Sequence, residues 1–266
     1  MFNNETLNII TPFKGNAIHE LKNTVNSLII QNYLKVNHIL VIDREAYVRI
    51  INFFENIEIT NNNYLYTILI SDKKGIYSSI NQALDTLSDY QPYLVLGAGD
   101  ILKLNSKINF DSHIQIFYFS YFLSSNVENL INSFRNIFLG MPYCHNALIF
   151  RKNKLRYNQF YNLSGDFDYY LNYKNYSNFK KKLFKKNLFM KEIKSGYIIY
   201  ESKNGISSQK KWLVNMQNLL IIFKNYSIIG LFIYLFLFLN KSFNKMFMTF
   251  KIYLLELKHL IIKLFI

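Results

Sequence analysis

The stretch Gln91-Pro92-Tyr93-Leu94-Val95-Leu96-Gly97-Ala98-Gly99-Asp100 decides the fold, because a very apolar run ends in small residues and a single carboxylate. A buried strand that ends in Gly-x-Gly-Asp places one acid at the rim of a sheet, where glycines let a phosphate or a metal ion approach the backbone closely. The stretch therefore predicts a site for a metal ion and a diphosphate. An ordinary turn after a strand is the alternative, and for this stretch alone it is the commoner explanation.

Outward from this stretch, short apolar runs alternate with helical spacings. The predicted strands are 7–11, 37–43, 64–71, 93–96, 115–122, 146–150 and 188–200, and the predicted helices are 21–29, 76–87, 127–138 and 166–173. The alternation favours an α/β class, with a mostly parallel, Rossmann-related sheet flanked by helices and followed by a C-terminal helical extension. Because ligands of such sheets bind beyond the carboxyl ends of the strands, Thr11, Asp43 and Asp100 are expected at the binding edge of the sheet.

The net charge of +14 lies in the C-terminal third of the chain. Residues 1–173 contain 14 basic and 14 acidic side chains, whereas residues 174–266 contain 17 basic and three acidic ones. After Ser208 the chain is rich in Leu, Ile, Phe and Met, which favours an anionic membrane surface over nucleic acid as a partner. We therefore predict a domain at 1–207 that carries the site, and a basic amphipathic helical region for membrane association at 208–266.

The C-terminal region contains an uncharged run at 228–239, which spans only about 18 Å as a helix, short of the roughly 30 Å of a hydrocarbon core. From Phe243 onward, apolar residues recur three or four apart among lysines, which is typical of a helix lying in a membrane interface. The alternative is a helix that packs on residues 1–207 or on a second subunit, and a homodimer is left open.

The cellular compartment is indicated by two features. Cys144 is the only cysteine, which excludes an intrachain disulfide and suits a reducing environment. The residues at 1–5 lack the basic and apolar segments of a secretory signal. We expect a cytoplasmic protein held peripherally on the inner face of the cell membrane.

Six segments, taken in order, resemble family 2 glycosyltransferases of the bacterial surface-polysaccharide type. They are 7–12, 38–43, 74–81, 96–100, 142–148 and 165–170, and the resemblance covers about residues 7–208. It implies a GT-A-like fold and an inverting hexosyltransferase of class EC 2.4. The implied reaction moves a sugar from a nucleotide diphosphate sugar, with a UDP-sugar favoured, to a glycan or a lipid-linked oligosaccharide.

The resemblance also implies roles for single residues. Asp166 matches the general base that accepts the proton of the acceptor hydroxyl, and Asp100 matches the ligand of Mn²⁺ or Mg²⁺. The residues implied for the donor nucleotide are Thr11, Pro12, Asp43, Gly75, Asn81 and Gly99. Those implied for the acceptor or donor pocket are Tyr77, His145 and Asp168.

Plainer structural roles compete with these assignments. Asp43 is also suited to cap a helix, Gly75 to begin one, and a single histidine such as His145 often serves only to satisfy hydrogen bonds. Arg44, Ser78 and Gly97 stand where the family has other residues, mostly small, polar or acidic ones. The rival hypothesis is therefore a non-catalytic, membrane-associated scaffold that retains the glycosyltransferase fold.

Overall fold

The computed structural model describes residues 6–15, 17–59, 61–71, 74–111, 114–124, 126–131, 136–183, 190–201 and 210–265, and the side chains at 126–130, 177–183 and 241–265 lie outside this description. The strands are β1 (Leu7–Phe13), β2 (Val36–Asp43), β3 (Tyr64–Ser71), β4 (Pro92–Val95), β5 (Ile101–Leu104), β6 (Ile116–Leu123), β7 (Asn126–Ile131), β8 (Leu148–Arg151) and β9 (Met190–Tyr200). The helices are α1 (Ile18–Ile29), α2 (Tyr47–Glu55), α3 (Ile76–Asp85), α4 (Gly165–Leu183) and α6 (Lys211–Phe265), with short 3₁₀ turns η1 (Arg44–Ala46), η2 (Ile137–Leu139) and η3 (His145–Ala147).

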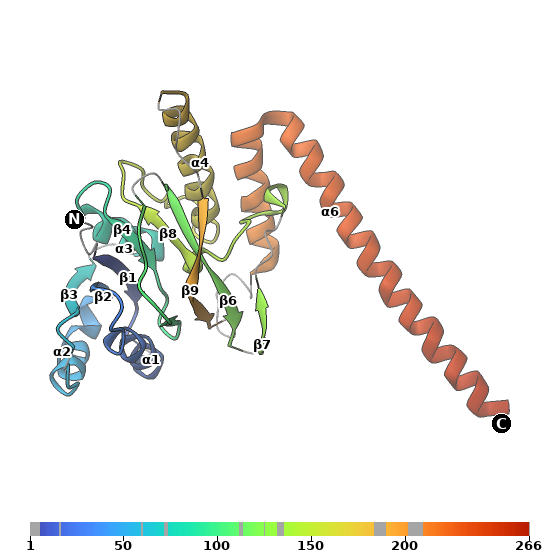
Figure 1. Ribbon diagram of the computed structural model, residues 1–266. Helices are drawn as coiled ribbons and strands as arrows, with labels where there is room; N and C mark the ends of the chain where they lie inside the picture. Colours follow the sequence, from blue (N-terminus) through green and yellow to red (C-terminus); the bar gives the residue numbers. More distant parts are fainter. Residues whose placement is uncertain are drawn as a thin grey trace.

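One mixed sheet runs through the molecule in the order β3-β2-β1-β4-β8-β6-β9-β5, with β7 paired to β6 (Figure 1). The first four strands in this order are parallel to one another, and β6 is parallel to β9. The remaining pairs are antiparallel, but most paired residues belong to parallel ladders. The apolar runs of β1, β2 and β4 are continuous because both faces of these strands are covered.

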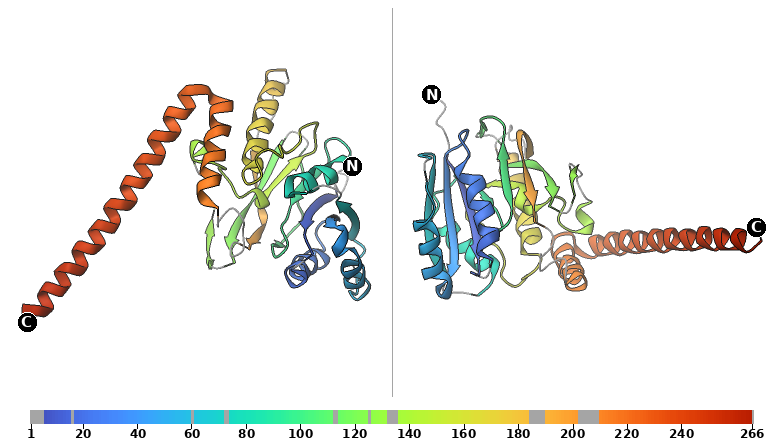
Figure 2. Two further views of the ribbon diagram at one scale, coloured as in Figure 1. Left: turned by 180° about the vertical axis from the view of Figure 1, so that it is seen from behind. Right: turned by 90° about the horizontal axis from the view of Figure 1, so that it is seen from below.

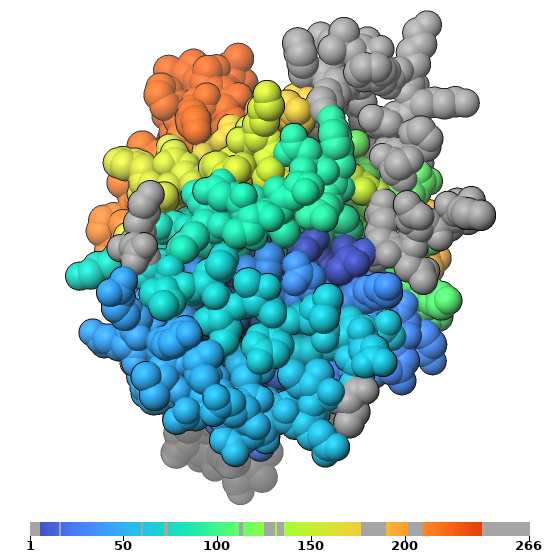
Figure 3. Space-filling view, turned by 90° about the vertical axis from the view of Figure 1, so that its left-hand side faces the viewer, coloured from blue at the N-terminus to red at the C-terminus, as the bar shows by residue number. Residues whose placement is uncertain are grey.

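Two hydrophobic cores lie on opposite faces of the sheet. On one face, α1 buries Leu21, Val25 and Leu28, and α2 buries Ile50 and Phe54. The other core collects buried residues of α3, α4 and the start of α6. The N-terminal half of the chain, coloured blue to green, forms one continuous side of the molecule in the space-filling view (Figure 3). This packing leaves the carboxyl ends of β1, β2, β4, β6 and β9 free to build a site at one edge.

Helix α6 consists of two arms joined at Ser227, whose φ of 56° and ψ of −157° are not helical. The proximal arm (residues 211–226) packs against α4 and η2, whereas the distal arm (residues 228–265) extends away from the sheet (Figures 1 and 2). The stretch Lys211–Asn240 is long and apolar enough to cross a membrane, by length and composition alone. The boundary near residue 207 and the membrane role of residues 208–266 stay predictions.

The predicted α/β class with a C-terminal helical extension is confirmed, but one predicted helix is wrong. Residues 127–138 were expected to be helical, whereas 126–131 form β7 and 137–139 form η2. The edge of β6 offers backbone partners to the segment after it, and this pairing overrides a local helical spacing. Helix α2 and strand β5 have no counterpart among the predicted elements.

Candidate active site

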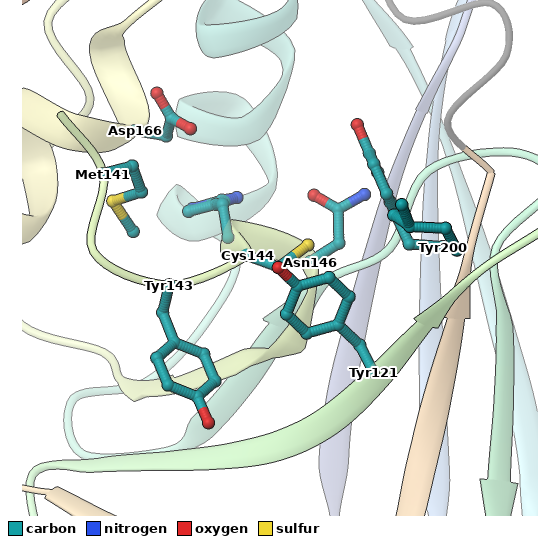
Figure 4. Close-up of a pocket in the computed structure, with 9 residues that line it drawn as sticks. Tyr121, Met141, Tyr143, Cys144, Asn146, Asp166 and Tyr200 are labelled. Atoms are coloured by element: carbon teal, nitrogen blue, oxygen red, sulfur yellow. The ribbon is translucent and has the colours of Figure 1, made fainter. Parts of the chain in front are cut away.

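A pocket of about 210 Å³ opens at the edge where β6 and β9 end and where the chain enters β8 (Figure 4). Its lining combines tyrosines, apolar and sulfur-containing side chains, two polar residues of the loop before β8, and one acid at the start of α4. The lining residues are Tyr121, Leu123, Met141, Tyr143, Cys144, His145, Asn146, Asp166 and Tyr200. In the close-up, Asp166 and Met141 lie on one side of the pocket and Tyr200 lies on the other (Figure 4).

Asp166 is the second residue of α4, where a negative charge is stabilised by the helix dipole. Its Oδ1 accepts hydrogen bonds from the Tyr77 hydroxyl at 3.2 Å and from the Phe167 N–H at 2.9 Å. Among the described residues, none donates a hydrogen bond to Oδ2. A Cβ added at Gly165 would lie 2.7 Å from Cε2 of Tyr77, so the absence of a side chain lets the Tyr77 ring rest against the start of α4.

His145 lies beside Asp166 in the pocket wall, and its Nε2 lies 2.8 Å from the hydroxyl oxygen of Tyr157. Burial lowers the pKa of His145, and the carboxylate of Asp166 opposes that shift. The Tyr157 ring stacks on Tyr77 at 5.7 Å between ring centres and on Tyr169 at 4.0 Å. A layer of stacked tyrosines thus supports both polar groups from behind.

Asn81 fixes that layer rather than facing the pocket. Its Nδ2 donates to the Tyr157 carbonyl at 2.8 Å, and its Oδ1 accepts from the Tyr157 N–H at 2.8 Å. Both ends of the Asn81 amide are therefore engaged by one residue's backbone. In this arrangement Asn81 acts on the site through Tyr157, which differs from the nucleotide contact that the resemblance implies.

Asp100 is buried, with 1% of its surface exposed, and lies behind Asn146. Its Oδ2 accepts from the Gly97 N–H at 2.8 Å and from Nδ2 of Asn146, while Oδ1 accepts from the Glu201 N–H at 2.8 Å. Burial raises the pKa of Asp100 to about 6, against the opposing effect of these hydrogen bonds. The carboxylate therefore hydrogen-bonds to three segments: the loop after β4, the turn η3 and the residue after β9.

This arrangement does not fit a metal ligand. Both oxygens of Asp100 are already bonded, and the residue is not part of the pocket surface. A Cβ at Gly97 would lie 3.0 Å from Oδ2 of Asp100, so a second acid there would crowd the first. Across the part of the chain that the structure describes, no group of three or more His, Cys, Asp or Glu could hold a metal ion.

The other residues implied for the donor lie along the same edge of the sheet, outside the pocket wall. Thr11 is buried and its Oγ1 lies 2.9 Å from Nε2 of His38, whereas Asp43 is exposed at the end of β2. Pro12 is half-buried in β1, and Gly75, with a φ of 111°, precedes α3. Gly99 has a φ of 98°.

Asp168 is buried and does not line the pocket. Its Oδ1 accepts from Nζ of Lys224 on α6 at 2.8 Å, and its Oδ2 accepts from Nδ2 of Asn172 at 3.0 Å. Of the residues implied for catalysis and sugar binding, the structure thus brings Asp166, His145 and Tyr77 together. It places Asp168 away from the pocket, in an ion pair with α6.

Several pocket residues were not anticipated. Tyr121 lies in the predicted strand 115–122, and Tyr143 and Asn146 lie in the 142–148 segment of the resemblance. The sequence marks both stretches but not the side chains in them that face the pocket. Tyr200 closes the pocket from the end of β9. No sequence signal marked it, because a tyrosine at the end of a strand is not specific.

Three solved structures share this architecture. TarS 1-349 from S. aureus in complex with UDP aligns with a TM-score of 0.54 at 13% identity, covering 83% of this chain and 66% of that one. TarS 1-349 in complex with UDP-GlcNAc aligns with a TM-score of 0.52 at 13% identity, covering 83% and 67%. The mannosyltransferase PcManGT from Pyrobaculum calidifontis, in complex with GDP-Man and Mn²⁺, aligns with a TM-score of 0.53 at 10% identity, covering 80% and 63%.

The chain has a GT-A-like fold. It spans about two thirds of the length of these structures. No family profile and no curated protein matches the sequence. In this GT-A-like fold, as in other sheets with parallel strands, the pocket lies at the carboxyl edge, where ligands of such sheets bind.

Proposed function

We propose that this GT-A-like protein is a glycosyltransferase that moves a sugar from a nucleotide diphosphate sugar to a hydroxyl of a glycan or a lipid-linked acceptor, with inversion. The observation that carries the proposal is Asp166, a single acid on the wall of an aromatic pocket, at the edge of a fold shared with structures holding UDP, UDP-GlcNAc and GDP-Man. Two of these ligands carry uridine, which supports a UDP-sugar as the donor.

In the proposed reaction, the acceptor hydroxyl loses its proton to Oδ2 of Asp166 while its oxygen bonds to the anomeric carbon. The bond from that carbon to the diphosphate oxygen breaks, and the electron pair leaves with the diphosphate on the opposite side, which inverts the configuration. The hydrogen bonds from Tyr77 and Phe167 both fall on Oδ1 and orient the carboxylate so that Oδ2 is the oxygen available for the proton.

The rest of the pocket suits a sugar ring. Tyr121, Tyr143 and Tyr200 offer aromatic faces, and Asn146 and His145 add polar groups among them. A concave site that combines apolar and aromatic walls with a few polar groups is typical of small-molecule binding. His145, kept neutral by burial, supplies a hydrogen-bonding ring rather than a positive charge.

The experiment is turnover and calorimetric binding of a panel of UDP-, GDP- and dTDP-sugars, each measured with Mn²⁺, with Mg²⁺ and with a chelator. Turnover of one donor supports the proposal and identifies the nucleotide, and the chelator arm reports whether a metal ion is needed. An absence of both binding and turnover across the panel would favour the non-catalytic scaffold.

A further inference from the structure

The proximal arm of α6 holds the segment that leads into Asp166. Oε1 of Gln217 accepts from the backbone N–H of Leu163 and of Ser164, each at 3.0 Å. Nε2 of Gln217 donates to Oδ1 of Asn162 at 2.7 Å. Gln217 is buried, and the residues it holds end two positions before Asp166. The orientation of the acid therefore depends on a side chain from the C-terminal helix.

The same arm supports a second segment of the pocket wall, which carries Met141 on the same side of the pocket as Asp166 (Figure 4). The rings of Phe138 in η2 and Tyr226 in α6 lie 5.1 Å apart. A Cβ at Gly140 would lie 2.7 Å from Nδ2 of Asn218, which shows how closely the helix and this loop pack. Met141, the next residue, lines the pocket. Two segments of the pocket wall thus rest on one helix.

The outer face of α6 is apolar and exposed on both arms. On the proximal arm the spacing of four, four and three places the exposed side chains on one side of the helix, whereas Gln217 is buried. The distal arm continues the pattern. We call this set the apolar stripe; it consists of Trp212, Met216, Leu220, Phe223, Ile228, Ile229, Phe232, Phe236 and Leu239. Large apolar side chains exposed in this number along both arms mark an interaction site.

A membrane surface fits the apolar stripe better than a transmembrane passage. The break at Ser227 and the packing of the proximal arm divide the apolar stretch, and the uncharged run at 228–239 spans about 18 Å against the roughly 30 Å needed. Five lysines and one glutamate lie between residues 241 and 263. An apolar face joined to an excess of positive charge is complementary to an anionic lipid interface.

We propose that the apolar stripe lies in the surface of an anionic membrane and that Gln217 makes α6 a positioning element for Asp166, so that membrane contact and the geometry of the acid are coupled. The first half of this proposal is independent of catalysis. The second half rests on the proposed function, because it concerns the alignment of the proposed base.

The membrane half is tested by flotation of the full chain with phosphatidylcholine vesicles that contain or lack phosphatidylglycerol. We expect binding to the anionic vesicles, weakened about tenfold or more by the double substitution Phe232→Ser and Phe236→Ser, which removes two exposed rings. Ile30→Ser with Leu65→Ser, equally exposed residues beside α1 and on β3, is the matched control and should bind as the wild type does.

Equal vesicle binding by both double variants, or none by the wild type, would overturn the membrane half. If light scattering instead shows a dimer that only the Phe232/Phe236 variant loses, the apolar stripe is covered by a second copy and the proposal is wrong.

The positioning half is tested with Gln217→Ala, with Gln31→Ala as the control. Gln31 is also buried, and its Nε2 donates to the carbonyls of Ser27 and Leu102, away from the pocket. We expect Gln217→Ala to lower kcat about tenfold with the donor KM unchanged, and to lose any stimulation of turnover by anionic vesicles. Gln31→Ala should keep both. Equal kcat losses in the two variants would show a merely structural role.

These readouts separate the two proposals. A wild type that binds vesicles but turns over no donor would contradict the proposed function and leave the membrane half supported. A wild type that turns over a donor without binding vesicles would support the proposed function and contradict the membrane half.

Discussion

The hydroxyl of Tyr77 on α3 donates to Oδ1 of Asp166 on α4 at 3.2 Å, joining two helices through residues that are 89 positions apart in sequence. The same ring stacks on Tyr157, whose hydroxyl meets His145. One tyrosine therefore links the acid of the pocket to the layer that supports its histidine.

Tyr77→Phe should lower kcat about tenfold without a change in the donor KM, because the ring still stacks while the hydrogen bond that orients Asp166 is lost. The measurement is steady-state turnover of the donor found in the panel. Tyr93→Phe is the control. It removes the buried 2.7 Å hydrogen bond between the hydroxyls of Tyr93 and Tyr169, which does not involve Asp166. A tyrosine-to-phenylalanine effect of the same size at both positions would argue against a specific role for Tyr77.

Asp100→Ala should lower the free energy of unfolding by about 2–4 kcal/mol, because it leaves three partly buried N–H donors without this acceptor. The loss should be the same with Mn²⁺ and with a chelator, measured by urea denaturation. A wild-type stabilisation by Mn²⁺ that this substitution abolishes would instead restore Asp100 as a metal ligand.

Asn81→Ala should cost about 1–3 kcal/mol of stability and leave donor affinity unchanged, since both ends of its amide bind the backbone of Tyr157. Denaturation and calorimetry on the same preparation give the two values. A large loss of nucleotide binding with little loss of stability would favour the direct contact that the family resemblance implies.

His38 should lower stability in mild acid, while Asp100, whose pKa is raised to about 6 by burial, acts in the opposite direction over the same range. Burial lowers the pKa of His38 from 6.5 to about 3. Below pH 6.5, His38 is therefore protonated in the unfolded chain but stays neutral in the folded one. The expected loss from this residue is about 1.4 kcal/mol at about pH 5.5, and it grows as the pH falls further. The slope of unfolding free energy between about pH 6.5 and 4.5 should be shallower in His38→Gln. Parallel slopes would exclude His38 as the source.

The sequence was sufficient for the parts of the fold that local patterns determine. Strands β1 to β3 are short, mostly apolar runs, and the buried face of α1 reflects its spacing. Residues 127–138 were predicted wrongly because pairing with β6, a tertiary contact, decides β7.

In the site too, local sequence patterns identify some residues, whereas contacts between distant residues determine others. Asp166 and His145 lie in short motifs, but one hydrogen-bond donor to Asp100, the N–H of Glu201, lies 101 residues away in sequence. Gln217 gave no signal, because a lone glutamine in an apolar helix has no local feature that reveals its partners at 163 and 164.

The most direct test that Asp166 is the general base compares sugar turnover by the wild type, Asp166→Asn and Asp85→Asn. Asparagine keeps an acceptor for Tyr77 but cannot take the proton, so Asp166→Asn should lose about two to four orders of magnitude in kcat with donor affinity retained. Asp85 is an exposed residue of α3 that pairs with Arg156, and Asp85→Asn should keep the wild-type kcat. Turnover by Asp166→Asn at the wild-type rate would contradict the assignment of the base.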